Sequence, residues 1–125
     1  MSGLDPVERN SLLRLARESI AYGLDNGGRP PGVALDMIPS ALRRPAACFV
    51  TLTNRGGALR GCIGTMEAKR ALALEIADRA CAAAFQDPRF PPVAAGELGE
   101  LFVGISVLGP RELMDVGDDG ALIAA

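Results

Sequence analysis

The 125-residue sequence contains no histidine and no tryptophan, and only five of its residues are aromatic, one tyrosine and four phenylalanines. Without histidine, the chain itself cannot form a Ser–His or Cys–His nucleophile pair, an imidazole metal site or a histidine pH switch. The few aromatic side chains are a poor supply of stacking platforms for nucleic-acid bases. These absences remove several common classes of active site and binding surface.

The sequence also lacks a large excess of either charge and has no long apolar run. Thirteen basic and fifteen acidic residues give a formal net charge of −2, which argues against a basic nucleic-acid footprint but leaves room for one local anion pocket. No apolar run is long enough to cross a bilayer, and the first residues lack the apolar stretch of a signal peptide. Three well-separated cysteines are typical of a reduced, cytoplasmic protein rather than a disulfide framework, and no cluster has metal-ligand spacing.

What remains is typical of one globular domain with a helix near its start. The length and the 49% apolar content allow a buried core. Asp5 and Pro6 occupy the positions preferred at a helix N-terminus, with Glu8 close behind, and apolar residues recur at helical spacing as far as Leu24. The sequence Asn-Gly-Gly at 26–28 predicts the end of this helix. A short element is expected around residues 40–43.

A hairpin is predicted from residues 46–53, the turn NRGG, and residues 58–64. If Thr53 faces Ala58, Thr51 lies opposite Arg60 and Phe49 lies opposite Cys62, and the other face of the hairpin is uniformly apolar. Cys62 and Arg60 should then share the face that is not the main apolar one. Cys48 points the other way and cannot be the disulfide partner of Cys62.

The remaining pattern predicts an alanine-rich helix over residues 69–86 and a strand over residues 100–108. The order helix, hairpin, helix and strand, with no run of βαβ units, predicts an α+β fold with helices packed on a mainly antiparallel sheet that contains the central hairpin. The chain stops within the apolar sequence ALIAA, so residues 1–125 are expected to form a single domain that is incomplete at its C-terminal end.

The segment LRGCIGT, residues 59–65, carries the residues best suited to chemistry. A guanidinium next to a thiol favours the thiolate, so Arg60 and Cys62, two residues apart on one strand face, are candidates for a catalytic pair. Gly61 and Gly64 would let a ligand approach backbone N–H groups, and Thr65 follows directly. The alternatives are equally physical: cysteine is often a buried packing residue, and glycines mark bulges or tight helix–sheet contacts.

A second candidate segment is FQDPRFPP, residues 85–92. Asp87, Arg89 and Phe90 lie around prolines on a stiff loop, where binding residues are common. They are candidates to orient Arg60 or bind a ligand. The alternative is a helix stop with a local Asp–Arg ion pair.

Taken together, the segments CFVTLT, LRGCIGT, AAAFQDPRFPPV and ELGELFVGISVLGPREL resemble the AMMECR-type domain, also called AmmeMemoRadiSam system protein A. The resemblance covers nearly the whole chain from about residue 10. It implies an α+β fold, an intracellular setting, and partners that are Memo-like and radical-SAM proteins. It also implies that the site lies at Arg60, Gly61, Cys62 and Gly64, with Asp87, Arg89 and Phe90 from the second segment, and it leaves the cofactor unknown.

Two functions follow as hypotheses. In the first, the chain is an enzyme or enzyme subunit that uses Cys62 as a nucleophile or thiol-redox group in a modification or redox pathway, with Arg60 favouring the thiolate and binding an anionic substrate. In the second, it is a non-catalytic binding module for a protein partner or a small anionic ligand. A third, structural reading makes the glycines and Cys62 packing devices.

Overall fold

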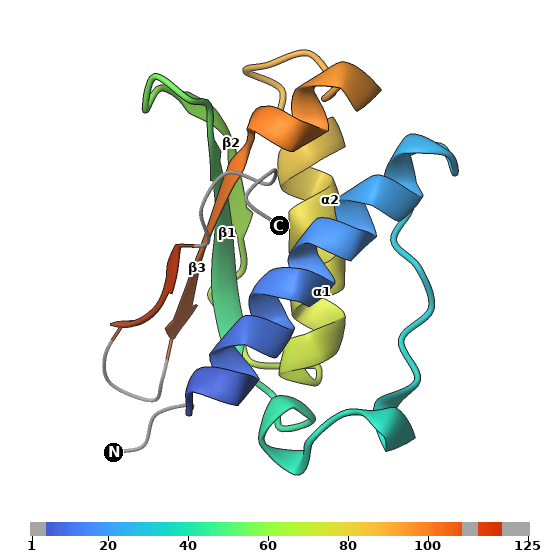
Figure 1. Ribbon diagram of the computed structural model, residues 1–125. Helices are drawn as coiled ribbons and strands as arrows, with labels where there is room; N and C mark the ends of the chain where they lie inside the picture. Colours follow the sequence, from blue (N-terminus) through green and yellow to red (C-terminus); the bar gives the residue numbers. More distant parts are fainter. Residues whose placement is uncertain (1–4, 109–112, 119–125) are drawn as a thin grey trace.

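The computed structural model describes residues 5–108 and 113–118, which form two helices packed on one face of a four-stranded sheet. The main elements are α1 (Pro6–Leu24), β1 (Ala47–Thr53), β2 (Leu59–Gly64), α2 (Leu72–Phe85), β3 (Phe102–Leu108) and β4 (Leu113–Asp118). Three short 3-10 helices are η1 (Leu35–Met37), η2 (Ser40–Leu42) and η3 (Ala95–Glu100). In Figure 1, α1 and α2 lie side by side and cover the same face of the sheet. The α+β prediction is confirmed.

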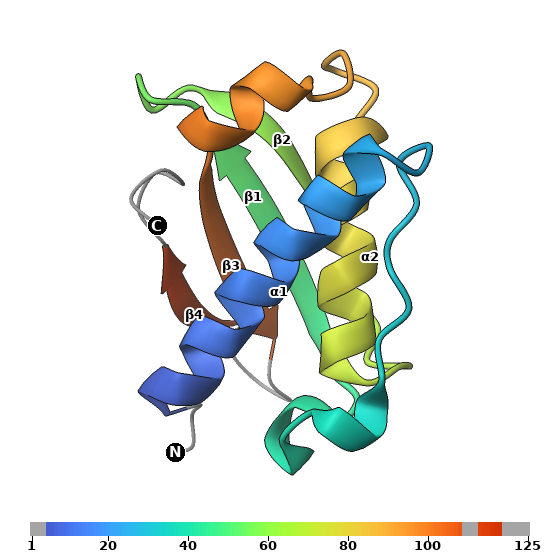
Figure 2. The same ribbon diagram turned by 45° about the vertical axis from the view of Figure 1, so that its right-hand side comes forward.

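The sheet has the strand order β2-β1-β3-β4, and every neighbouring pair is antiparallel. β2 is therefore an edge strand. The strand β4 was not predicted from the sequence, and the apolar C-terminal residues 119–125 lie outside the described part of the chain. In Figure 2, the segment after α2 returns across the end of the sheet next to β2 and continues through η3 into β3. Because η3 takes residues 95–100, β3 begins two residues later than predicted.

The start of α1 follows the sequence prediction closely. Asp5 is the N-cap, its carboxylate accepts a hydrogen bond from Glu8 N at 2.8 Å, and the Glu8 carboxylate accepts one from Asp5 N at 3.0 Å. This reciprocal capping box satisfies two backbone donors that the helix leaves free. Beyond the last turn, Gly27 and Gly28 adopt positive φ angles, which glycine does without a steric cost. The predicted end of the helix is confirmed.

The helix α2 begins at Leu72, three residues later than predicted. The reason is a backbone bridge between Pro45 and Ala71, in which Arg70 O accepts from Ala46 N and Leu72 N donates to Arg44 O. These bonds tie the start of α2 to the entry of β1, and they hold residues 70 and 71 in a bridge instead of a helical turn. The helix ends at Phe85, two residues before the Asp-Pro sequence that cannot continue it.

The predicted hairpin exists, but its predicted register is wrong by two residues. Thr51 pairs with Cys62 rather than with Arg60, and Val50 pairs with Ile63. One residue of the shift comes from the turn, where Asn54 N donates to Ala58 O and the Asn54 side chain accepts from the N–H groups of residues 56 and 58. The second comes from a β-bulge at Arg60. A shift of two keeps residues 61–64 on their predicted faces. Leu59 lies on the other side of the bulge, pairs with Thr53 and is 39% exposed, so it does not join the apolar face.

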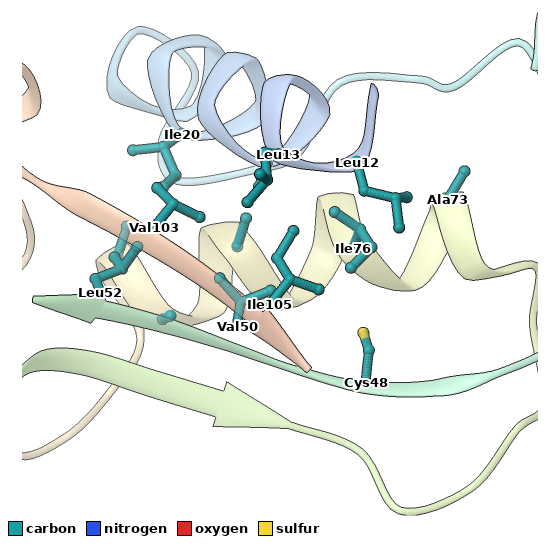
Figure 3. Packing of buried hydrophobic residues seen from close by; sticks show 14 of the residues in the cluster. Leu12, Leu13, Ile20, Cys48, Val50, Leu52, Ala73, Ile76, Val103 and Ile105 are labelled. Carbon is teal, nitrogen blue, oxygen red and sulfur yellow. The ribbon is translucent and has the colours of Figure 1, made fainter. Parts of the chain in front are cut away.

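The core lies between the helices and the face of the sheet that they cover. Figure 3 shows side chains from α1, α2, β1 and β3 meeting in this layer. The largest of them are fully buried and include Leu12, Ile20, Val50, Leu52, Ile76 and Val103. On the opposite face, the side chains of Phe49, Thr51, Cys62 and Phe102 are only half-buried. We call this second surface of β1, β2 and β3 the open face. No helix in the described ranges has the length and apolarity required to span a membrane.

Candidate functional site

The three cysteines have different surroundings, and only one of them lies outside the core. Cys48 is fully buried, and burial, together with the charge of Glu75, raises the pKa of its thiol to about 12. Cys81 is buried between α1 and α2, where its thiol donates to Ser19 O, and burial raises its pKa to about 11. Cys62 is half-buried on the open face. It is therefore the only one of the three thiols that solvent or a ligand reaches directly.

Among the residues that the structure describes, the hydroxyl of Thr51 is the one close polar neighbour of the Cys62 thiol. Their Sγ and Oγ1 atoms are 3.2 Å apart, and either can be the donor. The two residues are cross-strand partners on the open face, where side chains of a directly opposed pair approach one another. The Thr51 hydroxyl can therefore donate a hydrogen bond to a Cys62 thiolate and stabilise it.

Asp87 and Arg89 clamp the exposed edge of β2 at Cys62. The Asp87 carboxylate accepts from Cys62 N at 3.0 Å, and Arg89 Nη2 lies 3.5 Å from Cys62 O. The two side chains also bond to one another, with Arg89 Nε 3.0 Å from Asp87 Oδ1 and Nη2 2.7 Å from Oδ2. The ion pair thus gives the edge strand both an acceptor and a donor, as a neighbouring strand would.

The electrostatics of this clamp follow from its geometry. Hydrogen bonds from the Arg89 side chain, from Arg89 N and from Cys62 N hold the pKa of Asp87 well below its ordinary value. The pKa of Arg89 is raised, chiefly by its hydrogen bond to the Asp87 side chain. The Arg89 guanidinium carbon lies 5.4 Å from the centroid of the Phe90 ring, within cation–π range. Asp87, Arg89 and Phe90 are thus brought together beside Cys62.

Arg60 makes a different set of contacts. Its guanidinium donates to Pro91 O at 2.9 Å and to Pro92 O at 3.4 Å, and forms two bonds of 2.8 and 2.9 Å to the Glu97 carboxylate. The hydrogen bonds from Arg60 to the Glu97 carboxylate lower the pKa of Glu97 below its ordinary value. Arg60 stands at the bulge, where simple strand alternation no longer sets the direction of a side chain. It fastens β2 to the segment 91–97.

The sequence does not predict Glu97 as a partner of Arg60. A partial signal was present, because its carboxylate accepts from Ala94 N at 2.9 Å, which is the pattern of an acid three residues into a helix. That pattern predicts a cap. It does not predict a partner 37 residues earlier in the chain.

Gly61 and Gly64 lie at positions where a neighbouring group occupies the space that a side chain would need. A Cβ on Gly61 would lie 2.1 Å from Ala83 O, so α2 packs directly on the backbone of β2. A Cβ on Gly64 would lie 2.3 Å from the ring of Phe49, which faces it across the hairpin. Close packing accounts for both glycines without a ligand. Thr65 follows in a turn, with its hydroxyl accepting from Glu67 N at 3.2 Å.

The other parts of the molecule that the structure describes are less suited to a metal, catalytic or binding site. Among residues 5–108 and 113–118, no group of three or more acidic or cysteine side chains is arranged to hold a metal ion. A hollow of about 310 Å³ lies where α1 and α2 end, lined by Gly23, Leu24, Gly27, Gly28, Phe85, Pro92 and Val93. Its lining contains no titratable side chain. The surroundings of Cys62 are therefore the candidate site.

Comparison with known proteins places this chain in a family. The AMMECR1 family model matches residues 13–124, and the chain belongs to the AMMECR1 domain family. A protein from Methanococcoides burtonii is 40% identical over 116 residues, which are 93% of this chain and 56% of that protein. A protein from Thermotoga maritima is 52% identical over 79 residues, which are 62% of this chain and 45% of that protein.

A solved structure supports the same assignment. The crystal structure of an uncharacterised protein from Pyrococcus horikoshii matches with a TM-score of 0.79 and 35% sequence identity, over 87% of this chain and 55% of that one. The chain thus spans about half the length of these relatives. The family resemblance predicted from the sequence is confirmed.

Proposed function

We propose that this AMMECR1-domain chain is an enzyme or an enzyme subunit that uses the Cys62 thiol in a modification or redox pathway. The observation that carries the proposal is the contrast among the cysteines: Cys48 and Cys81 are buried, whereas Cys62 lies on the open face next to the Thr51 hydroxyl and the Asp87–Arg89 pair. A partly exposed thiol beside a hydroxyl donor, in a residue whose backbone also lies next to a cation, is the kind of setting in which cysteines react.

The step would be a nucleophilic attack by the Cys62 sulfur. The sulfur forms a bond to an electrophilic carbon, or to one sulfur of a disulfide, and the leaving group departs with the electron pair of the broken bond. Both Asp87 carboxylate oxygens already accept hydrogen bonds. The thiol proton would therefore pass to water or to a base on a partner. The family resemblance supplies the partners that we propose, a Memo-like and a radical-SAM protein in the cytoplasm.

Alkylation resolved by cysteine tests this proposal. Native protein is treated with iodoacetamide at pH 7.5, and each cysteine is followed by peptide mass spectrometry, with the urea-unfolded chain as the reference. We expect Cys62 to react at least about tenfold faster than Cys48 and Cys81, and faster in the native than in the unfolded chain. Simple exposure explains the first result but not the second. A native Cys62 that reacts no faster than the unfolded one contradicts the proposal.

One observation favours the alternative of a binding module. The hydrogen bonds of Asp87 and Arg60 serve to join β2 to the segment after α2, as a rigid recognition surface requires. In that case Arg60→Ala should abolish a complex with the Memo-like or radical-SAM protein of the same organism, while Cys62→Ser retains it. Arg55→Ala, in the exposed hairpin turn, is the matched control. The reverse pattern in the pull-down supports the thiol enzyme.

A further inference from the structure

Two arginines lie near Cys62, and the structure gives them different tasks. The Arg60 side chain is 12% exposed and makes four hydrogen bonds, to both oxygens of Glu97 and to two proline carbonyls. The Arg89 side chain is 56% exposed, and among the described residues its Nη1 atom has no hydrogen-bond partner. Arg60 is thus occupied within the protein, whereas Arg89 has N–H groups available to a ligand.

We infer that Arg89, and not Arg60, is the anion-binding residue of the Cys62 site, and that the substrate carries a carboxylate or a similar oxygen anion near its electrophilic atom. The inference deepens the proposed function and rests on it. Arg60 is then a positioning residue, which holds the segment 91–97 against β2.

The Asp87–Arg89 pair is neutral as a unit, but it presents its two charges unequally. The Asp87 side chain is 2% exposed and the Arg89 side chain is 56% exposed. A ligand approaching the pair therefore meets the guanidinium and not the carboxylate. The buried Asp87 holds two N–H groups along one edge of the guanidinium, whose carbon lies 5.4 Å from the centroid of the Phe90 ring. A guanidinium held in this way loses little side-chain freedom when it binds an oxygen anion.

The location of the guanidinium brings it next to Cys62. Arg89 Nη2 lies 3.5 Å from the backbone oxygen of Cys62 itself, and Asp87 holds the backbone nitrogen of the same residue. The electrostatic effect of Cys62 on the pKa of Arg89 is consistent with this proximity. An anion on Arg89 would thus lie next to the residue that attacks.

A pair of alkylating probes tests the inference. Iodoacetate and iodoacetamide react alike: the Cys62 sulfur forms a bond to carbon, the carbon–iodine bond breaks, iodide leaves, and the thiol proton passes to the buffer. They differ in charge, so the ratio of the iodoacetate rate constant to the iodoacetamide rate constant reports attraction of an anion. We compare the native protein with Asp87→Asn/Arg89→Gln, which removes both charges of a neutral pair, and with Arg60→Gln.

We expect the ratio to fall at least about threefold in Asp87→Asn/Arg89→Gln, the scale of an exposed charge contact, and to stay within about twofold in Arg60→Gln. A purely structural role for Arg89 would change both rate constants and leave their ratio constant. A ratio that stays constant in the double variant, or that falls as much in Arg60→Gln, overturns the inference.

The native protein provides a second measurement that does not depend on the variants folding. At constant ionic strength, we expect sulfate to slow iodoacetate at least about twofold more than iodoacetamide, because it competes for the guanidinium. Equal slowing of the two probes contradicts the inference. The proposed function fails separately, if native Cys62 is no faster than the unfolded chain with either probe.

Discussion

The β1–β2 hairpin carries a cysteine on each of its faces, and the two sulfurs have opposite surroundings. In Figure 3, the sulfur of Cys48 points from β1 into the layer of core side chains. Cys48 is fully buried there, whereas Cys62 lies half-buried on the open face with the Thr51 hydroxyl 3.2 Å away. One thiol is kept protonated by burial, and the other is within reach of a reagent. The face of the strand, rather than the residue type, separates a cysteine packed in the core from one that a reagent can reach.

The same contrast applies to the hydrogen bonds on the two sides of β2. Toward β1, its backbone bonds belong to an ordinary antiparallel ladder. Toward the outer edge, at Cys62, they go to the side chains of Asp87 and Arg89. The candidate site thus lies along the edge of β2 where side chains take the place of a neighbouring strand.

The largest effect is expected where α2 touches β2. A valine at Gly61 would place its Cβ 2.1 Å from Ala83 O, and neither backbone can yield without moving an element. We expect Gly61→Val to lower the free energy of unfolding by about 3 kcal/mol or more, measured by urea denaturation. Gly96→Ala is the control, since a Cβ there meets nothing within 4 Å and should cost little. Similar losses in the two variants would show that the close approach of α2 is not needed.

The next prediction compares the two cysteines directly. Cys48→Ser puts a hydroxyl into an apolar core and should cost about 2 kcal/mol in unfolding free energy. Cys62→Ser should cost less than about 0.5 kcal/mol, because the new hydroxyl lies within hydrogen-bond reach of Thr51 and is partly solvated. Urea denaturation of both variants at pH 7 gives the comparison. Equal costs would mean that Cys62 is a packing residue and would remove the basis of the contrast.

Raising the pH above 9 should lower the free energy of unfolding, because Cys48 is buried in the core as a neutral thiol. Its pKa is raised from 9.0 to about 12, so the folded chain keeps a proton that the unfolded chain loses. The contribution of the protonated Cys48 thiol to stability is fully present below pH 9 and is lost as the pH rises toward 12. Over that range the free energy of unfolding falls by about 1.4 kcal/mol for each pH unit. Denaturation midpoints between pH 8 and 11 should therefore fall less steeply in Cys48→Ala than in Cys62→Ala. Parallel curves would contradict the buried state of the Cys48 thiol.

The sequence predicted most of the local structure because its signals were local. The capping residues Asp5 and Glu8, the glycine stop after α1 and the alternating strands all depend on near neighbours. The register of the hairpin depended on the Asn54 side chain and on a bulge at Arg60, and neither has a clear pattern in the sequence. Beyond the bulge the shift is an even two residues, so Cys62 lies on its predicted face although its predicted partner is wrong.

The candidate site was harder to predict, because its contacts join distant parts of the chain. The two segments around Cys62 and Asp87 were selected from their composition, but nothing in the sequence shows that Asp87 binds the backbone of Cys62 25 residues away. The proximity of Arg60 and Cys62 in the sequence favoured Arg60 as the partner of the thiol. Arg60 instead bonds to Glu97 and to two carbonyls. These contacts could be predicted only from the path of the chain between α2 and η3, which the sequence does not show.

The smallest effect concerns this Arg60–Glu97 contact at the outer edge. Glu97→Gln keeps the size of the side chain and removes its charge. Because the Glu97 side chain is 40% exposed, we expect the free energy of unfolding to fall by less than about 1 kcal/mol at pH 7. The pKa of Glu97 is lowered in the fold, so its contribution is present above the ordinary value of 4.5 and lost as the pH falls below it. The variant and the native protein should therefore converge in stability toward pH 3, whereas a constant difference would show that the contact acts through shape alone.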